Sequence, residues 1–124
     1  DEARSTCPRG EFFVGDIISF SPERRYDLVL ALHVFVHLVE DADWEKALDV
    51  VTSSLNPDGL FLLRDPLPAE RERVNVHVLT RSRAEYESAL SARGLQFTDE
   101  ASHEQLSHAH TVRWKSFGEE TAAP

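Results

Sequence analysis

The stretch of sequence that decides the fold is YDLVLAL, residues 26–32. It is apolar almost without alternation, which is typical of a strand that is covered on both faces of a parallel sheet. A buried helix is the alternative interpretation, because Leu and Ala favour helices. The charged pair before the run and the shortness of the run favour a strand.

The segment after this run predicts a helix and then a second strand. Apolar residues follow Trp44 at positions 47, 48, 51 and 55, which places them on one face of an α-helix. Asp41 or Asp43 is expected to cap this helix. Residues 56–59, NPDG, predict a turn, and residues 60–63, LFLL, predict a second buried strand. The order strand, helix, turn, strand predicts a βαβ unit with two parallel strands.

The remaining segments complete an α/β pattern. Residues 11–17 predict a brief strand, and residues 66–81 an irregular segment with a possible extended stretch. Ser82 and Glu85 have the spacing of a capping box, and Gly94 stands where a left-handed residue ends a helix. Two further strands are expected, one opening at residues 95–98 and one over residues 110–117. We expect an α/β fold: a mostly parallel sheet with an antiparallel C-terminal hairpin.

Composition sets limits on the protein's class. The chain has 124 residues, a formal net charge of −9 at pH 7, and no Met. The length fits one domain, and the negative charge argues against a broad nucleic-acid interface. No apolar run approaches the ~20 residues that span a bilayer. The single Cys7 forms no internal disulfide and suits a reducing compartment, so a cytoplasmic location without membrane or nucleic-acid partners is expected.

The ordered set of segments resembles class I S-adenosylmethionine-dependent methyltransferases, which have a Rossmann-like fold. Residues 26–38, YDLVLALHVFVHL, resemble the fourth strand and following loop of that family. Residues 55–63, LNPDGLFLL, resemble its Leu-x-Pro-Gly-Gly turn and fifth strand, with Asp58 in place of the first Gly. Residues 13–17, FVGDI, resemble its third strand. Residues 82–117 match its last helix and two antiparallel strands.

The family's Gly-rich first turn and the acid that follows its second strand have no counterpart in this sequence. The five Gly, at positions 10, 15, 59, 94 and 118, contain no G-x-G element. We therefore expect residues 11–117 to form a partial methyltransferase-like domain truncated at its N-terminus, preceded by a loop or helix remnant at 1–10 and followed by a flexible tail at 118–124. S-adenosylmethionine is the cofactor implied by the resemblance, and weak or no binding of it by this chain alone is expected.

The resemblance also implies site residues. Asp16 would accept a hydrogen bond from the adenine amino group, with Ile17 against the ring, and Leu32 and His33 would lie beside the cofactor. His33 and His37 follow the central strand at the sheet edge where ligands bind, and a neutral imidazole suits removal of a proton near pH 7. Simpler interpretations are an acid that closes a turn at Asp16, and two imidazoles that share one face of a short helix.

Other roles were weighed for the remaining polar side chains. His33 with His37, and His108 with His110, have spacings that can present two imidazoles to a metal, but no H-E-x-x-H motif accompanies them, so no metal site is predicted. Asp65, just past the second buried strand, either faces an acceptor or caps the turn into the next residue.

The expected function is methyl transfer to a small-molecule acceptor, with the chain alone inactive. A non-catalytic methyltransferase-like interaction or dimerisation module is the alternative. Without its first two strands, the strand at residues 28–32 would keep an open edge and uncovered faces, which favours association. A homo-oligomer, or a complement to a missing N-terminal segment, is therefore expected.

Overall fold

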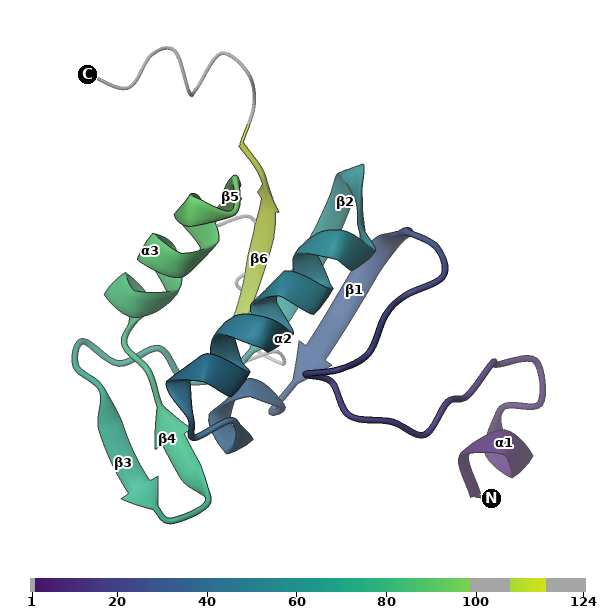
Figure 1. Ribbon diagram of the computed structural model, residues 1–124, viewed down its shortest axis with the longest axis horizontal. Coiled ribbons are helices and arrows are strands. Elements are labelled where there is room, and N and C mark those ends of the chain that lie inside the picture. Colours follow the sequence, from purple (N-terminus) through teal and green to yellow (C-terminus); the bar gives the residue numbers. More distant parts are fainter. Residues whose placement is uncertain (1, 99–107, 116–124) are drawn as a thin grey trace.

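The structure is a computed structural model that describes residues 2–98 and 108–115. Its main feature is a four-stranded sheet with the order β1-β2-β6-β5 (Figure 1). The strands are β1 (Tyr26–Leu32), β2 (Leu55–Arg64), β5 (Leu95–Phe97) and β6 (Ala109–Trp114). β1 and β2 run parallel, and β6 runs antiparallel to both of its neighbours. The α/β class, the parallel central pair and the antiparallel terminal hairpin are confirmed.

The predicted βαβ unit is present. Helix α2 (Asp41–Ser54) connects β1 to β2, and the strands pair in register from Leu28 opposite Leu60 to Leu32 opposite Arg64. The N-cap of α2 is Glu40, which makes no side-chain cap bond, so the prediction that Asp41 or Asp43 caps the helix is wrong. Both acids lie instead in the first turn, where their charge favours the helix dipole.

Two boundaries of the unit differ from the expected ones. Leu55, expected on the face of the helix, is its C-cap and begins β2. Residues 56–59, expected to form a turn, are part of β2, and the register of β1 and β2 shifts between Tyr26 and Leu28 to accommodate them. The chain therefore makes no separate turn at residues 56–59, and these residues form an irregularity in the pairing of β1 with β2.

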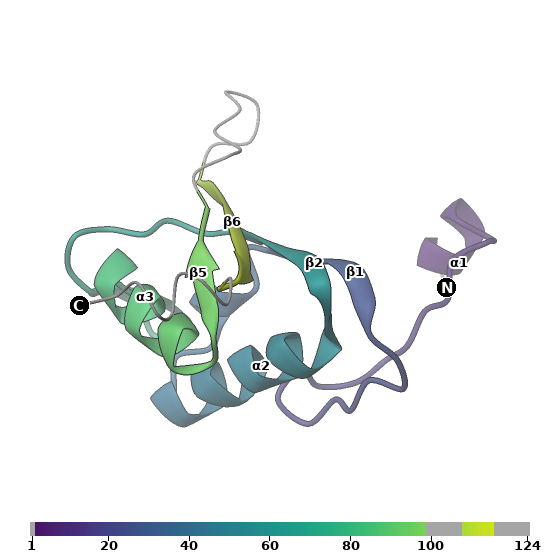
Figure 2. The ribbon, with the colours of Figure 1, turned by 90° about the horizontal axis from the view of Figure 1, so that it is seen from above.

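The hydrophobic core lies on one face of the sheet, under α2 and helix α3 (Arg83–Ala92), as Figure 2 shows. Side chains alternate along a strand, so Phe61 and Leu63 of β2 point into this core and are fully buried. Phe35 meets Phe61 edge to face, with ring centroids 6.1 Å apart, and Trp44 meets Tyr86 in the same way at 5.1 Å. This layer holds the strand ends in place.

The other face of β1 is open. Leu28, Leu30 and Leu32 are 52%, 53% and 48% exposed. Leu60 and Leu62, the register partners of Leu28 and Leu30 in β2, are half-buried, and Leu32 lies opposite Arg64. We call these five leucines the open face. Within the described residues, the outer edge of β1 pairs with no strand, so the expected open edge and uncovered face are observed.

The strand predicted over residues 11–17 is absent, and this prediction is wrong. The segment carries no strand in the structure, and Phe13 and Val14 are 70% and 96% exposed. A β-strand requires a neighbour that takes its backbone hydrogen bonds, and no described strand lies beside this segment.

The remaining elements follow local signals. Ser82 and Glu85 form the predicted capping box at the start of α3, and Gly94 has the predicted positive φ, 82°. Residues 66–81, expected to be irregular, contain the hairpin β3 (Glu72–Asn75) and β4 (Val78–Thr80). A short helix α1 (Glu2–Thr6) and the 3-10 turn η1 (Phe35–His37) complete the elements. The predicted tail at 118–124, and positions 116–117 of the predicted last strand, lie outside the described residues.

Candidate functional site

The candidate site lies where β1 and β2 end. Parallel strands present their carboxyl ends at one edge of the sheet, and ligands of α/β sheets bind there. His33 follows β1, and its backbone N–H donates to the Arg64 carbonyl at 2.9 Å. Asp65 follows β2, and its N–H donates to the His108 carbonyl at 3.0 Å. These backbone bonds bring three chain segments together at what we call the carboxyl edge.

Two of these segments have an unusual backbone. His33 and His108 have φ values of 56° and 63°, and they are the two non-glycine residues with positive φ in the described ranges. This left-handed conformation costs a side-chain-bearing residue about 1 kcal/mol. Such strain persists where the surrounding structure fixes the backbone, and it concentrates at functional sites.

Asp65 is the unusual side chain of the carboxyl edge. Its side chain has no exposed surface, and neither carboxyl oxygen has a hydrogen-bond partner among the described residues. Burial raises the pKa of Asp65 from an ordinary 3.8 to about 7, and the nearby backbone N–H of Phe35 offsets only part of that rise. The carboxyl makes no hydrogen bond that would cap the turn into Pro66, so that interpretation is wrong, whereas a position facing an acceptor stays a prediction.

His33 is the ionisable side chain that comes near this carboxyl. Its Nδ1 lies 3.9 Å from Oδ1 of Asp65, while 51% of the imidazole side chain is exposed. The separation is longer than a hydrogen bond but within the range of an ion pair. His33 therefore lies between a buried acid and the outside of the molecule.

The other predicted site residues lie apart from this pair. His37, at the end of η1, is exposed, and its Nδ1 lies 3.4 Å from the carbonyl oxygen of His77 in the β3–β4 hairpin. Leu32 lies on the open face next to His33. The structure thus brings His33 and Asp65 together and directs His37 toward the hairpin.

Asp16 and Ile17 occupy the irregular segment before β1. Asp16 is exposed, its Oδ1 accepts from the Ile18 N–H at 3.1 Å, and its carbonyl accepts from the Ser19 N–H at 3.1 Å. This is the simple turn-closing arrangement that was weighed against an adenine contact. Ile17 is half-buried and packs against the core. The adenine-binding roles of both residues stay predictions.

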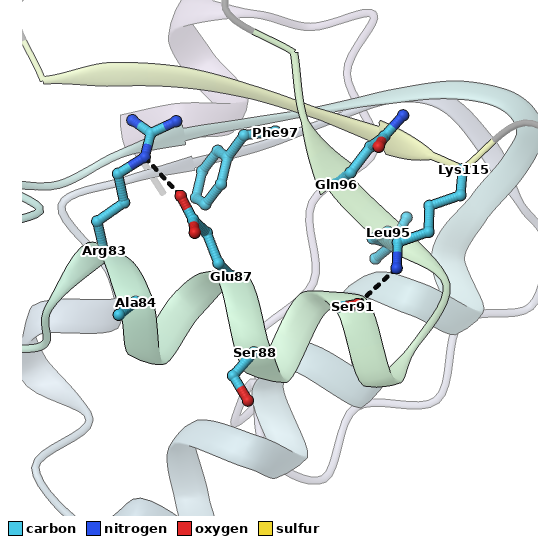
Figure 3. Close-up of a pocket in the computed structure, with 9 residues that line it drawn as sticks. All are labelled: Arg83, Ala84, Glu87, Ser88, Ser91, Leu95, Gln96, Phe97 and Lys115. Atoms are coloured by element: carbon cyan, nitrogen blue, oxygen red, sulfur yellow. Dashed lines mark hydrogen bonds and ion pairs between the residues drawn. The ribbon is translucent and has the colours of Figure 1, made fainter. Parts of the chain in front are cut away.

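One surface groove of the described residues lies away from the carboxyl edge. Figure 3 shows a groove of about 490 Å³ between α3 and β5, which shares no residue with the carboxyl edge. Arg83 and Glu87 form an ion pair along α3 at 2.8 Å, and Lys115 Nζ donates to the Ser91 hydroxyl at 2.5 Å. The charged side chains of the groove are thus engaged within it, and we place no site there.

Two further classes of site were tested on the described ranges. No three His, Cys, Asp or Glu side chains within residues 2–98 and 108–115 come together in a way that would hold a metal ion. Over the same ranges, no helix has both the length and the apolar character needed to cross a bilayer.

The chain is similar in fold to several solved methyltransferases. DesVI from Streptomyces venezuelae superposes with a TM-score of 0.70 at 16% identity, covering 92% of this chain and 69% of DesVI. CalS10, an amino pentose methyltransferase from Micromonospora echinaspora, gives 0.68 at 15% identity, covering 92% and 68%. The mitomycin 7-O-methyltransferase MmcR gives 0.67 at 23% identity, covering 92% and 37%. The chain therefore spans between about a third and two thirds of these relatives.

Comparison by sequence identifies a family but no individual curated relative. No curated protein matches the chain by sequence. The family described as "Methyltransferase domain" matches residues 4–114, which is most of the chain. The order of β1, α2, β2, α3 and the terminal hairpin agrees with this match, as the superposed structures do. The chain thus belongs to the methyltransferase domain family, and its fold is that of the class I S-adenosylmethionine-dependent methyltransferases.

Proposed function

We propose that this chain is part of an enzyme that transfers the methyl group of S-adenosylmethionine to an oxygen, nitrogen or carbon of a small-molecule acceptor. The observation that carries the proposal is the carboxyl edge, where His33 and Asp65 meet beside the exposed Leu32. Relatives support a small acceptor, since CalS10 is an amino pentose methyltransferase and MmcR a mitomycin 7-O-methyltransferase. The family match favours this function over a non-catalytic interaction module.

The chemistry requires little of the protein beyond positioning and proton removal. When bound, the cofactor supplies an electrophilic methyl group on a sulfonium. The protein then holds the acceptor in line with that methyl and removes a proton where the acceptor carries one. In this proposal Leu32 forms an apolar wall beside the cofactor, and the imidazole of His33 or His37 removes the proton. Asp16 and Ile17 are assigned to the adenine.

We infer that the described residues would form one wall of a cofactor site rather than an enclosed site. Leu32 ends an apolar strand next to a polar edge, which suits a ligand with an apolar ring and a charged centre. The sequence holds no Gly-rich turn that would let the backbone approach such a ligand closely. We therefore infer that this chain alone binds the cofactor weakly or not at all.

The open face is the reason to expect assembly. Its leucines form a contiguous apolar strip next to the free edge of β1, and both features favour pairing with another chain. When this chain is alone in solution, the partner available to it is a second copy. We infer that two or more copies cover the open face, in place of a segment that the longer relatives have.

Titration calorimetry with S-adenosylhomocysteine tests the binding inference. At concentrations where the chain is monomeric, no heat of binding is expected in the micromolar range. A dissociation constant below about 10 μM, equivalent to roughly −7 kcal/mol, would show that the chain alone is competent and would overturn the inference.

Sedimentation velocity tests the assembly. We expect wild-type chain to associate at micromolar concentration, and Leu30→Glu to remain monomeric because it places a charge in the centre of the open face. Ser88→Glu introduces the same charge on the exposed side of α3 and serves as the matched control that still associates. A monodisperse wild-type monomer would contradict the inference.

A further inference from the structure

The starting point is the burial of Asp65. Among the described residues it is the only buried acid, and it is in phase with Phe61 and Leu63, so its side chain lies on the core side of the sheet. A carboxylate that is buried without hydrogen bonds is costly, because neither water nor the protein compensates its charge. A position that keeps such a group needs either a proton on the carboxyl or a cation that approaches it.

His33 is the group placed to meet that need. Its Nδ1 is 3.9 Å from Asp65 Oδ1, so a small rotation of the half-exposed imidazole closes a hydrogen bond. The left-handed backbone at His33 is fixed from both sides, by the end of β1 and by the bond from its N–H to Arg64. An imidazole is thus held at a backbone position that Gly or Asn would occupy at lower cost.

We propose that Asp65 and His33 form one proton-holding pair, in which Asp65 positions the imidazole through Nδ1 and His33 accepts the acceptor's proton at Nε2. This inference rests on the proposed function and deepens it. The acceptor O–H or N–H bond breaks, and its proton goes to Nε2. The acceptor's electron pair forms the new bond to the methyl carbon, while the carbon–sulfur bond breaks and its electron pair stays on sulfur. Nδ1–H donates to Asp65 throughout.

The surroundings of Asp65 favour this division of roles. His33 approaches from the end of β1, the Phe35 N–H from η1, and the His108 carbonyl from the turn before β6. The buried Tyr86 of α3 is close enough to interact electrostatically with the Asp65 carboxylate. Burial is the main cause of the raised pKa of Tyr86, and the negative charge of Asp65 adds to it. Arg81, which is near enough to Tyr86 to lower its pKa, is itself bonded to Asp41. His33 is therefore the side chain available to orient around the carboxyl.

Nitrogen-15 NMR of the imidazoles gives the decisive test, because the hydrogen bond of one ring nitrogen sets the tautomer. In wild-type chain above pH 8, we expect His33 as the Nδ1–H tautomer, with Nε2 free. Asp65→Leu removes the oxygen that accepts from Nδ1, so the Nε2–H tautomer is expected instead. Asp58→Asn, at an exposed position in β2, the strand that Asp65 follows, is the matched control that leaves the His33 signals unchanged. An Nε2–H tautomer in the wild type would overturn the proposal.

A second variant keeps Asp65, so its result does not depend on whether the substitution of Asp65 disturbs folding. In His33→Gln the positively chargeable neighbour of the carboxyl is lost, so the pKa of Asp65, followed by carbon-13 NMR, is expected to rise further. An unchanged Asp65 titration in this variant means that the two groups are independent and refutes the pair.

Reactivity tests the outward nitrogen. Diethylpyrocarbonate attacks unprotonated imidazole nitrogen, so mass spectrometry is expected to show faster modification of His33 than of the exposed His77 in the wild type. That advantage is expected to be lost in Asp65→Leu. Equal rates in the wild type would refute a free Nε2. None of these measurements needs cofactor or acceptor, so their failure leaves the proposed function standing, and failure of the cofactor titration leaves the pair standing.

Discussion

The buried carboxyl of Asp65 makes the stability of the fold depend on pH in an unusual direction. Burial raises its pKa from 3.8 to about 7, so the folded state holds a proton that the unfolded chain has already lost. At about 1.4 kcal/mol for each pH unit of displacement, the full effect is about 4 kcal/mol. This stabilisation is present below pH 3.8 and is lost as the pH rises through 7. Between pH 5 and pH 8, about 2.5 kcal/mol of it disappears.

Asp65→Asn isolates this contribution, because the amide stays neutral over the whole range. Urea unfolding, followed by the fluorescence of the buried Trp44, gives the free energy of unfolding at pH 5, 6, 7 and 8. The quantity to examine is the wild-type value minus the variant value, in which independent groups cancel. We expect this difference to fall by about 2.5 kcal/mol from pH 5 to pH 8.

The control is Asp58→Asn, which makes the same substitution at an exposed position of β2, the strand that Asp65 follows, and so reports the effect of losing an acid that is not buried. A flat difference for Asp65→Asn would refute the reasoning, since it would mean that the carboxyl titrates alike in both states. A difference that rises with pH would show that the folded state stabilises the carboxylate through a partner.

Three other substitutions have defined costs in urea unfolding at fixed pH. Arg81→Ala removes a fully buried guanidinium that bonds Asp41 at 3.0 Å, and it is expected to lower the free energy of unfolding by about 3 kcal/mol. Its control, Arg73→Ala on the exposed hairpin, should change that free energy by no more than about 0.5 kcal/mol. Equal effects of the two substitutions would contradict the role of burial. Ser82→Ala removes the capping hydroxyl of α3 and is expected to cost about 1 kcal/mol; no loss would mean that the capping box does not stabilise the helix. Gly94→Ala places a Cβ on a residue with φ 82° and should cost about 1–2 kcal/mol, with an unchanged midpoint as the opposing result.

The parallel pair and its crossover helix were predictable because their signals are local and repeated. An unbroken apolar run at residues 26–32 indicates a covered strand, and the spacing from Trp44 to Val51 places a stripe on one helix face. The capping box at Ser82 is likewise a short-range pattern with a direct geometric consequence.

The segments that were mispredicted depend on partners rather than on their own residues. Residues 11–17 have the composition of a strand, but a strand forms only against a neighbour. The β3–β4 hairpin was predicted only as a possible extended stretch within residues 66–81, because β3 is exposed at every position and has no buried face to define a strand pair. Tertiary context decided both segments.

The site was predictable in location more than in detail. Parallel strands end at one edge, and His33 does follow β1 at that edge, while its role there stays a prediction. The burial of Asp65 also had a signal, since it continues the alternation of Phe61 and Leu63, but from the sequence only a position facing an acceptor or a cap on the following turn was considered. The left-handed backbone of His33 could not be predicted, because even histidine, which is enriched at positive φ, adopts that conformation at only a small share of its positions.

At His33 the left-handed backbone favours a residue other than histidine, whereas the proposed proton transfer requires the imidazole. Glycine or asparagine would relax the chain there by about 1 kcal/mol and would delete the imidazole. Libraries screened only for heat tolerance should therefore enrich those two residues at position 33, whereas libraries screened for turnover should retain histidine, and sequencing the survivors of both would show which demand shaped this position.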